Sequence, residues 1–155
     1  MVTDMTWQTN TTTSEQTEAL GEHIGRRLRG GEVIALASDL GGGKTTFTRG
    51  LARGAGSLDR VASPTFTISK EYVGPKFTIV HFDFYRLQEA GVVAEELREY
   101  IGDPNTVVVV EWGEIVEDVL PADRLTVEIK HQSGEGRELT FQADASLKYL
   151  LEGMK

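Results

Sequence analysis

A glycine-rich stretch at residues 37–47, ASDLGGGKTTF, carries the residue types that most clearly point to chemistry. Three consecutive glycines allow backbone N–H groups to point toward one anion, and Lys44 and Thr45 follow them directly. A lysine in this place can contact the β- and γ-phosphates of a nucleotide, and the hydroxyl after it can bind Mg²⁺. The stretch therefore predicts a phosphate-binding loop.

The first position of this loop departs from the general pattern G-x-x-x-x-G-K-[ST], because Ser38 stands where a glycine is usual. A serine can turn the chain out of a strand wherever φ stays negative. The substitution therefore weakens the match to the sequence pattern more than it weakens the ability of the loop to bind phosphate. The alternative interpretation is a glycine-rich turn that only caps a helix. The position of the loop between an apolar strand and a helix favours phosphate binding.

Two carboxylates follow predicted strands, where an α/β sheet usually binds its ligands. Asp83 ends the run IVHFD, and Glu111 follows four consecutive valines; either is otherwise an ordinary surface carboxylate. Thr65 in SPTFT either approaches Mg²⁺ and the γ-phosphate or belongs to a proline-stiffened strand entry. His81 is expected to be a packed strand histidine rather than a base, since no nucleophile pairs with it in the sequence.

The elements that must position these residues alternate between helices and strands. Apolar periodicity predicts helices at 14–28, 44–55 and 91–102, and strands at 32–37, 65–73, 76–85 and 106–112, followed by a hairpin of 124–130 and 137–143. The first helix begins with a capping pattern at Ser14 and Thr17. This order predicts an α/β fold, with a mainly parallel central sheet flanked by helices and an antiparallel C-terminal hairpin.

Length and composition narrow the classes of protein. The 155 residues suit one domain, 1–155, with a substantial core. Sixteen basic against 24 acidic residues give a net charge of −8, which argues against nucleic-acid binding by this chain alone. The absence of cysteine excludes disulfides and thiolate chemistry. The N-terminus lacks the apolar core of a signal peptide, and no run is long enough to span a membrane, so we expect a cytoplasmic protein.

Four motifs occur in an order that resembles one known family. DLGGGKTTFTRGLARG, SPTFT, HFDFYRL and EWGE, within a match from about Ser14 to Arg137, are similar to the TsaE (YjeE) family. These are small bacterial P-loop ATPases of tRNA threonylcarbamoyladenosine (t6A) biosynthesis. The departure is again Ser38, where the family usually has glycine.

The resemblance implies a P-loop NTPase-like fold that uses ATP and Mg²⁺. It implies that Lys44, Asp83 and Glu111 are catalytic and that Thr45, Asp83 and Glu111 bind the metal. The implied nucleotide-binding residues are those of the loop and the helix after it, the switch-like segment, the tryptophan beside the site and two residues at the adenine: Asp39, Leu40, Gly41, Gly42, Gly43, Lys44, Thr45, Thr46, Thr65, Trp112, Ser14 and Arg137.

The resemblance also implies partners. Family members are thought to act on a threonylcarbamoyltransferase complex of the TsaD and TsaB type, which ATP hydrolysis resets between turnovers. An acidic chain would then meet tRNA only indirectly, and no membrane is involved. Two alternatives stay open at this stage: a P-loop kinase for a small molecule, although no arginine-rich lid is visible between Tyr85 and Thr106, and a nucleotide-sensing module without catalysis.

Overall fold

The computed structural model of the chain describes residues 4–38, 43–61, 69–83, 91–111 and 117–154, and for 91–93 it describes the backbone alone.

The described strands form one mainly parallel sheet. They are β1 (Met5–Thr11), β2 (Val33–Ser38), β3 (Ser69–Val73), β4 (Thr78–Asp83), β5 (Thr106–Glu111), β6 (Leu125–His131) and β7 (Arg137–Ala143). Their order across the sheet is β1-β7-β6-β2-β5-β4-β3. The four central strands β6, β2, β5 and β4 are parallel, whereas β3 at one edge and β7 and β1 at the other run antiparallel to their neighbours. The predicted fold class is confirmed.

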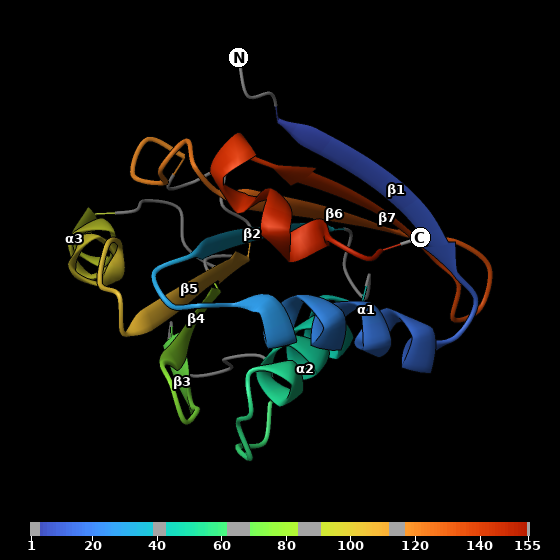
Figure 1. Cartoon of the computed structure of the whole chain (residues 1–155), viewed down its shortest axis with the longest axis horizontal. Coiled ribbons are helices and arrows are strands. Elements are labelled where there is room, and N and C mark those ends of the chain that lie inside the picture. Colours follow the sequence, from blue (N-terminus) through green and yellow to red (C-terminus); the bar gives the residue numbers. More distant parts are fainter. Residues whose placement is uncertain (1–3, 39–42, 62–68, 84–90, 112–116, 155) are drawn as a thin grey trace.

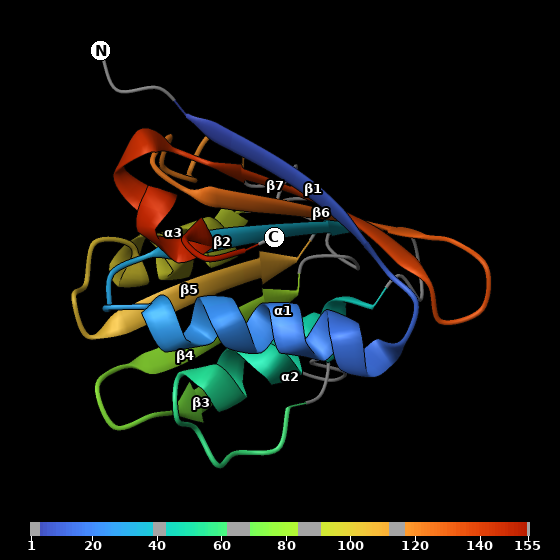
Figure 2. The ribbon, with the colours of Figure 1, turned by 45° about the vertical axis from the view of Figure 1, so that its right-hand side comes forward.

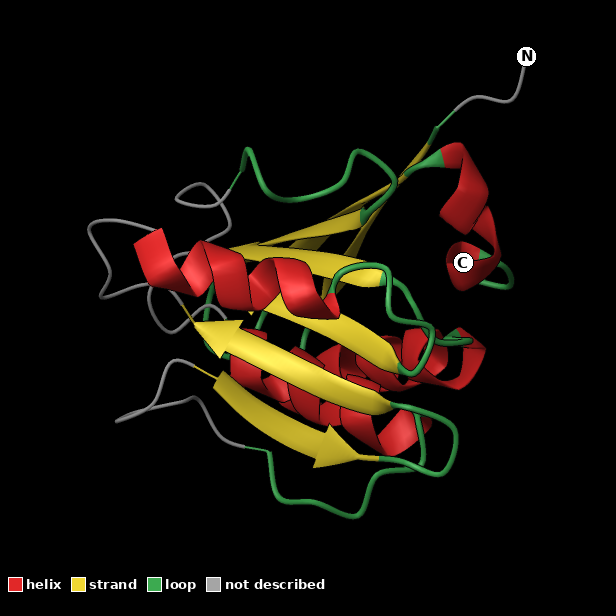
Figure 3. Ribbon diagram, turned by 90° about the vertical axis from the view of Figure 1, so that its left-hand side faces the viewer, coloured by secondary structure: helices red, strands yellow, loops and turns green. Residues whose placement is uncertain are grey.

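Helices cover both faces of this sheet (Figure 1). Helices α1 (Ser14–Arg27) and α2 (Lys44–Gly54) lie side by side on one face, as a second view also shows (Figure 2). The short 3-10 helix η2 (Ala145–Leu151) packs on this face too, and α3 (Gly91–Tyr100) covers the other, so that the sheet lies between α3 and the remaining helices (Figure 3). No helix within the described ranges is both long enough and apolar enough to cross a membrane.

Alternation along the central strands produces two separate cores. In β2, Ile34 and Leu36 belong to the core beneath α1 and α2, whereas Val33 and Ala35 belong to the core beneath α3. The valines of β5 divide between the two cores in the same way. Because successive side chains of a strand point to opposite faces, both faces of a central strand must be apolar. This explains the continuous valine run.

Helices α1 and α2 approach so closely that glycine is required where they cross. A Cβ atom on Gly21 would lie 2.2 Å from the carbonyl oxygen of Phe47, and one on Gly50 would lie 2.0 Å from that of Glu18. Gly25 and Gly54 repeat this arrangement one turn further along their helices. Small residues spaced by four let two helix backbones come close. The crossing thereby fixes α2, whose first residues belong to the predicted phosphate loop.

The structure corrects and extends the predicted elements. The N-cap of α1 is Thr13, not Ser14, because the Thr13 hydroxyl accepts a hydrogen bond from the amide of Gln16. Thr17 instead exchanges a 2.7 Å hydrogen bond with the Thr11 hydroxyl. Strand β1 and helix η2 were not predicted. The predicted strand at 65–73 contains β3, and the one at 76–85 contains β4, which begins only at Thr78. Residues 65–68, 84 and 85 of those predictions lie outside the described ranges.

Candidate functional site

The start of α2 presents the predicted phosphate-binding residues directly after strand β2. Ser38 is the last residue of β2 and pairs with Ile129 of β6, so its extended backbone does not require glycine. Gly43 is the N-cap of α2 with φ 100°, a left-handed conformation that favours glycine. Its carbonyl accepts from the amide of Phe47 at 2.9 Å. Lys44 and Thr45 thus occupy the first turn, where backbone N–H groups are available to an anion.

The two predicted carboxylates lie side by side at the carboxyl ends of β4 and β5. Asp83 and Glu111 are direct partners in the parallel register, and Leu36 of β2 is the partner of Glu111 on its other side. Both strands place the core residues Ile79, Val107 and Val109 beneath α1 and α2. Strand alternation therefore puts the side chains of Asp83 and Glu111 on the face that carries α2.

The ammonium group of Lys44 interacts electrostatically with both carboxylates. Burial of this lysine lowers its pKa below the usual value, and the negative charges of Glu111 and Asp83 oppose that shift. The three side chains therefore lie within electrostatic reach of one another, although they come from three different elements. Glu111 itself is only 2% exposed, a buried position for a carboxylate.

These groups fit a magnesium ion. The Oε1 atom of Glu111 is buried and lies 3.2 Å from Nε2 of His81 without a well-aligned hydrogen bond among the described residues, so this carboxylate still has acceptor capacity for a cation. Two carboxylates and the hydroxyl of Thr45 are hard oxygen donors. Mg²⁺ characteristically binds one or two carboxylates and completes its shell with phosphate oxygens and water. No group of three or more His, Asp or Glu that could hold a metal by itself occurs in the described part of the chain.

A small cavity of about 40 Å³ brings together residues from three distant segments of the chain. It is lined by Ser14, Thr17, Gly43, Thr46, Glu135 and Arg137. The amide of Ser14 donates to Oε1 of Glu135 at 3.1 Å, and this bond ties the start of α1 to the β6–β7 turn. A Cβ atom on Gly43 would lie 3.3 Å from Nε of Arg137, so the arginine lies against the end of the loop. The predicted adenine residues Ser14 and Arg137 are therefore neighbours beside α2.

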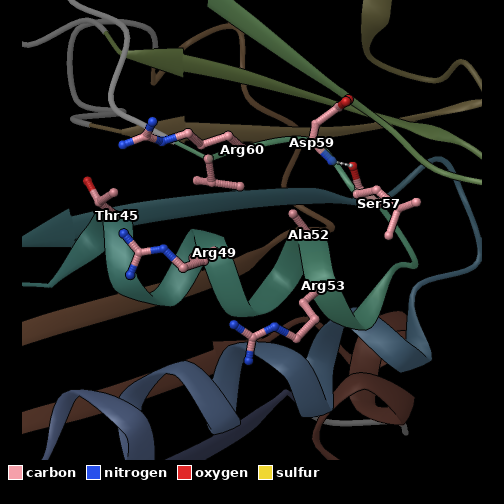
Figure 4. Close-up of a pocket in the computed structure, with 9 residues that line it drawn as sticks. Thr45, Arg49, Ala52, Arg53, Ser57, Asp59 and Arg60 are labelled. Atoms are coloured by element: carbon pink, nitrogen blue, oxygen red, sulfur yellow. Dashed lines mark hydrogen bonds between the residues drawn. The ribbon is translucent and has the colours of Figure 1, made fainter.

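A second, larger hollow of about 640 Å³ opens along another side of α2. Its lining includes Thr45 and three arginines, Arg49, Arg53 and Arg60 (Figure 4). Arg49 and Arg60 lie at the end of the hollow where Thr45 lies, and Arg53 pairs with Glu18 of α1 at 3.1 Å. Guanidinium groups favour anions, so this otherwise acidic chain is locally basic beside the predicted magnesium hydroxyl.

Part of the predicted site lies outside the described residues, namely Asp39, Leu40, Gly41, Gly42, Thr65 and Trp112. Sequence reasoning missed Thr17 and Glu135 as cavity residues. Glu135 lies in the hairpin turn HQSGEG, and that turn contained no signal of its own for contact with α1. His81 is fully buried, as expected for a packed strand histidine.

Comparison with known proteins identifies relatives over most of the chain. Residues 11–139 match the family model described as threonylcarbamoyl adenosine biosynthesis protein TsaE. The tRNA threonylcarbamoyladenosine biosynthesis protein TsaE of Bacillus subtilis is 40% identical over 135 residues, covering 86% of this chain and 83% of the relative. The protein of the same name from Streptomyces coelicolor is 39% identical over 118 residues, covering 75% and 80%.

A solved structure agrees with the sequence relatives. The crystal structure of Bacillus subtilis YdiB superposes with a TM-score of 0.76 at 36% sequence identity, over 98% of this chain and 94% of the other. Together with the family match over residues 11–139, this similarity settles the relationship. The chain belongs to the TsaE family of threonylcarbamoyl adenosine biosynthesis proteins.

Proposed function

We propose that this protein is a Mg²⁺-dependent ATPase that serves t6A biosynthesis by acting on a threonylcarbamoyltransferase complex. The observation that carries the proposal is the meeting of Lys44, Asp83 and Glu111 at the first turn of α2. A lysine at the N-terminus of a helix binds phosphate, and paired carboxylates hold a hard cation. A nucleotide with its Mg²⁺ needs both a phosphate-binding helix N-terminus and a pair of carboxylates in one place.

Each residue of this cluster has a distinct role in the proposal. The amides at the start of α2 bind phosphate oxygens, and the Lys44 ammonium contacts the β- and γ-phosphates. Thr45, Asp83 and Glu111 would hold Mg²⁺ directly or through water. The ion, when bound, neutralises charge that develops on the phosphate oxygens during hydrolysis. Glu111, which is buried and lies nearest the centre of the sheet, orients the attacking water.

The small cavity beside Gly43 is proposed to receive the edge of the adenine. At about 40 Å³ it takes the edge of a planar ring rather than a whole nucleoside. The Arg137 guanidinium, whose Nη1 donates to the Gly136 carbonyl at 2.7 Å, is held in place to stack on the ring. Ser14 and Thr46 add polar groups to the lining.

The partner part of the proposal rests on family membership and on charge. The relatives are proteins of t6A biosynthesis, so the chain works where a tRNA is modified. A net charge of −8 opposes direct contact with the tRNA backbone. We therefore propose that the chain binds partner proteins of the TsaD and TsaB type, and that these partners bind the tRNA.

Three measurements separate this function from a kinase and from a nucleotide sensor. Calorimetry with ATP, with and without Mg²⁺, should show metal-dependent binding to one site. Phosphate release should be slow for the chain alone and rise at least about tenfold when TsaD- and TsaB-type partners are added. Transfer of labelled phosphate to a panel of small acceptors would instead indicate a kinase, and binding without release in the presence of partners would indicate a sensor.

A further inference from the structure

Three buried side chains form a line from β3 to the predicted catalytic carboxylate. They are Tyr72, His81 and Glu111, with exposed fractions of 1%, 0% and 2%. The Tyr72 hydroxyl lies 3.1 Å from Nδ1 of His81, and the opposite ring nitrogen, Nε2, lies 3.2 Å from Oε1 of Glu111. Strand alternation places all three on the face of the sheet that carries α2.

The chemistry of the three groups fixes the direction of their hydrogens. An ionised carboxylate only accepts, so Nε2 of a neutral imidazole must carry the proton that faces Glu111. Nδ1 is then an acceptor, and the Tyr72 hydroxyl donates to it. The Glu111 carboxylate thereby selects the Nε2–H tautomer, and the tyrosine, which can donate to Nδ1, holds the ring plane.

The contact with Glu111 is close but not yet aligned. Nε2 and Oε1 lie 3.2 Å apart, yet neither atom makes a hydrogen bond of good geometry within the described residues. Catalytic hydrogen bonds are often poorly aligned in the absence of substrate and tighten when the complex forms. Once aligned, this bond would engage one oxygen of Glu111 and leave the other to the ligand.

We propose that His81, fixed by Tyr72, is a positioning residue that orients the Glu111 carboxylate for ATP hydrolysis. This inference rests on the proposed ATPase function. The role needs only the Nε2–H of His81 and no proton transfer. A donor that holds one carboxylate oxygen lowers the freedom of the other, so its effect is expected in the rate of hydrolysis rather than in ATP binding.

The kinetic test uses two substitutions at one position. His81→Leu keeps most of the buried volume and removes the N–H, so kcat should fall at least about tenfold while the KM for ATP stays within about twofold. His81→Gln can place an amide N–H near the position of Nε2 and should recover most of the lost kcat. Tyr72→Phe should lower kcat by a smaller factor. His23→Gln on α1, whose ring contacts the Glu152 carbonyl, is the matched control and should leave both constants unchanged.

A spectroscopic test covers the case in which His81→Leu does not fold, which urea denaturation will show. The chain has three histidines, and His23→Gln removes one signal for assignment. Imidazole ¹⁵N spectra of wild type should show the Nε2–H tautomer for His81, and Tyr72→Phe should increase exchange with the other tautomer. An Nδ1–H tautomer in wild type would overturn the inference.

The outcomes distinguish this inference from the function on which it rests. If wild type hydrolyses ATP with partners and His81→Leu is equally active, His81 only packs and the inference is wrong. Equal losses in the Leu and Gln variants, with kcat and KM moving together, would also contradict it. If wild type itself hydrolyses no ATP with partners present, the proposed function fails and the positioning role fails with it.

Discussion

Gly43→Ala tests whether the backbone conformation at the start of α2 serves the proposed phosphate binding. Gly43 has φ 100°, which an alanine adopts only with strain. Such backbone strain typically costs about 1–3 kcal/mol. Alanine also restricts the unfolded chain, which raises the free energy of unfolding by about 0.4–1 kcal/mol. The new Cβ lies 3.3 Å from Nε of Arg137, so that flexible side chain must move by a few tenths of an ångström. The expected net loss in the free energy of unfolding is about 1–2 kcal/mol.

Gly102→Ala is the matched control for this prediction. Gly102 has φ 90°, close to that of Gly43, and a Cβ atom there meets nothing within 4 Å. Both variants should therefore lose similar stability in urea denaturation, since the strain is the same. Only Gly43→Ala should weaken Mg-ATP binding in calorimetry, by at least about tenfold or roughly 1.4 kcal/mol, because relief of its strain turns the first helix amides away from the phosphates.

Two results would refute the reasoning. If Gly43→Ala loses stability as Gly102→Ala does but binds Mg-ATP as well as wild type, the conformation of Gly43 does not serve the ligand. If both variants weaken ATP binding equally, the lower stability of the protein explains the weaker binding, and the conformation of Gly43 does not.

The remaining predictions concern the charge in the site, the helix crossing and a buried carboxylate. Lys44→Ala should raise the Kd for Mg-ATP at least about tenfold, because a hydrogen bond to a charged group contributes about 1.5–3 kcal/mol; unchanged calorimetry would exclude the lysine from the site. Gly50→Ala should lose at least about 2 kcal/mol in urea denaturation, because its Cβ would lie 2.0 Å from the Glu18 carbonyl oxygen and force α1 and α2 apart; wild-type stability would contradict the close crossing. Tyr149→Phe should lose about 1–3 kcal/mol, because the phenol donates to the buried Glu32. Burial and this bond raise the Tyr149 pKa, so the native state keeps a proton that the unfolded state loses, and wild type should lose stability above about pH 10 more steeply than the variant.

The parts of the fold that sequence reasoning predicted are those with local signals. The strand, glycine loop and helix around Lys44 follow from apolar runs and turn residues that are contiguous in the chain. The four valines of β5 predict a strand buried on both faces, and the structure shows this burial. The hairpin of β6 and β7 follows from alternation around HQSGEG.

The missed elements had weaker but readable patterns. Strand β1 is largely polar, yet Met5 and Trp7 alternate toward the core, and the Trp7 ring lies 5.5 Å from that of Phe141. Helix η2 buries Leu147, Leu150 and Leu151, whose spacing is helical. Strand β1 was hidden because polar residues separate its few apolar ones, and η2 because it is only seven residues long.

The assembly of the site depends on contacts between distant segments, which no local pattern specifies. The parallel register that pairs Asp83 with Glu111 is set by how β4 and β5 pack, not by either strand alone. The cavity beside Gly43 is lined by α1, α2 and the hairpin turn, whose Glu135 accepts from the Ser14 amide at the start of α1. Sequence reasoning reached Ser14 and Arg137 only through the resemblance to a family.

The most direct test of the proposed function counts t6A molecules formed per threonylcarbamoyltransferase complex in a reconstituted reaction with tRNA. Wild type with Mg-ATP should support many modifications per complex. Glu111→Gln, which keeps the buried side chain's shape and removes its charge, should bind Mg-ATP but support no more modifications than the complex forms without this chain. The account is contradicted if Glu111→Gln supports as many turnovers as wild type, or if wild type adds none.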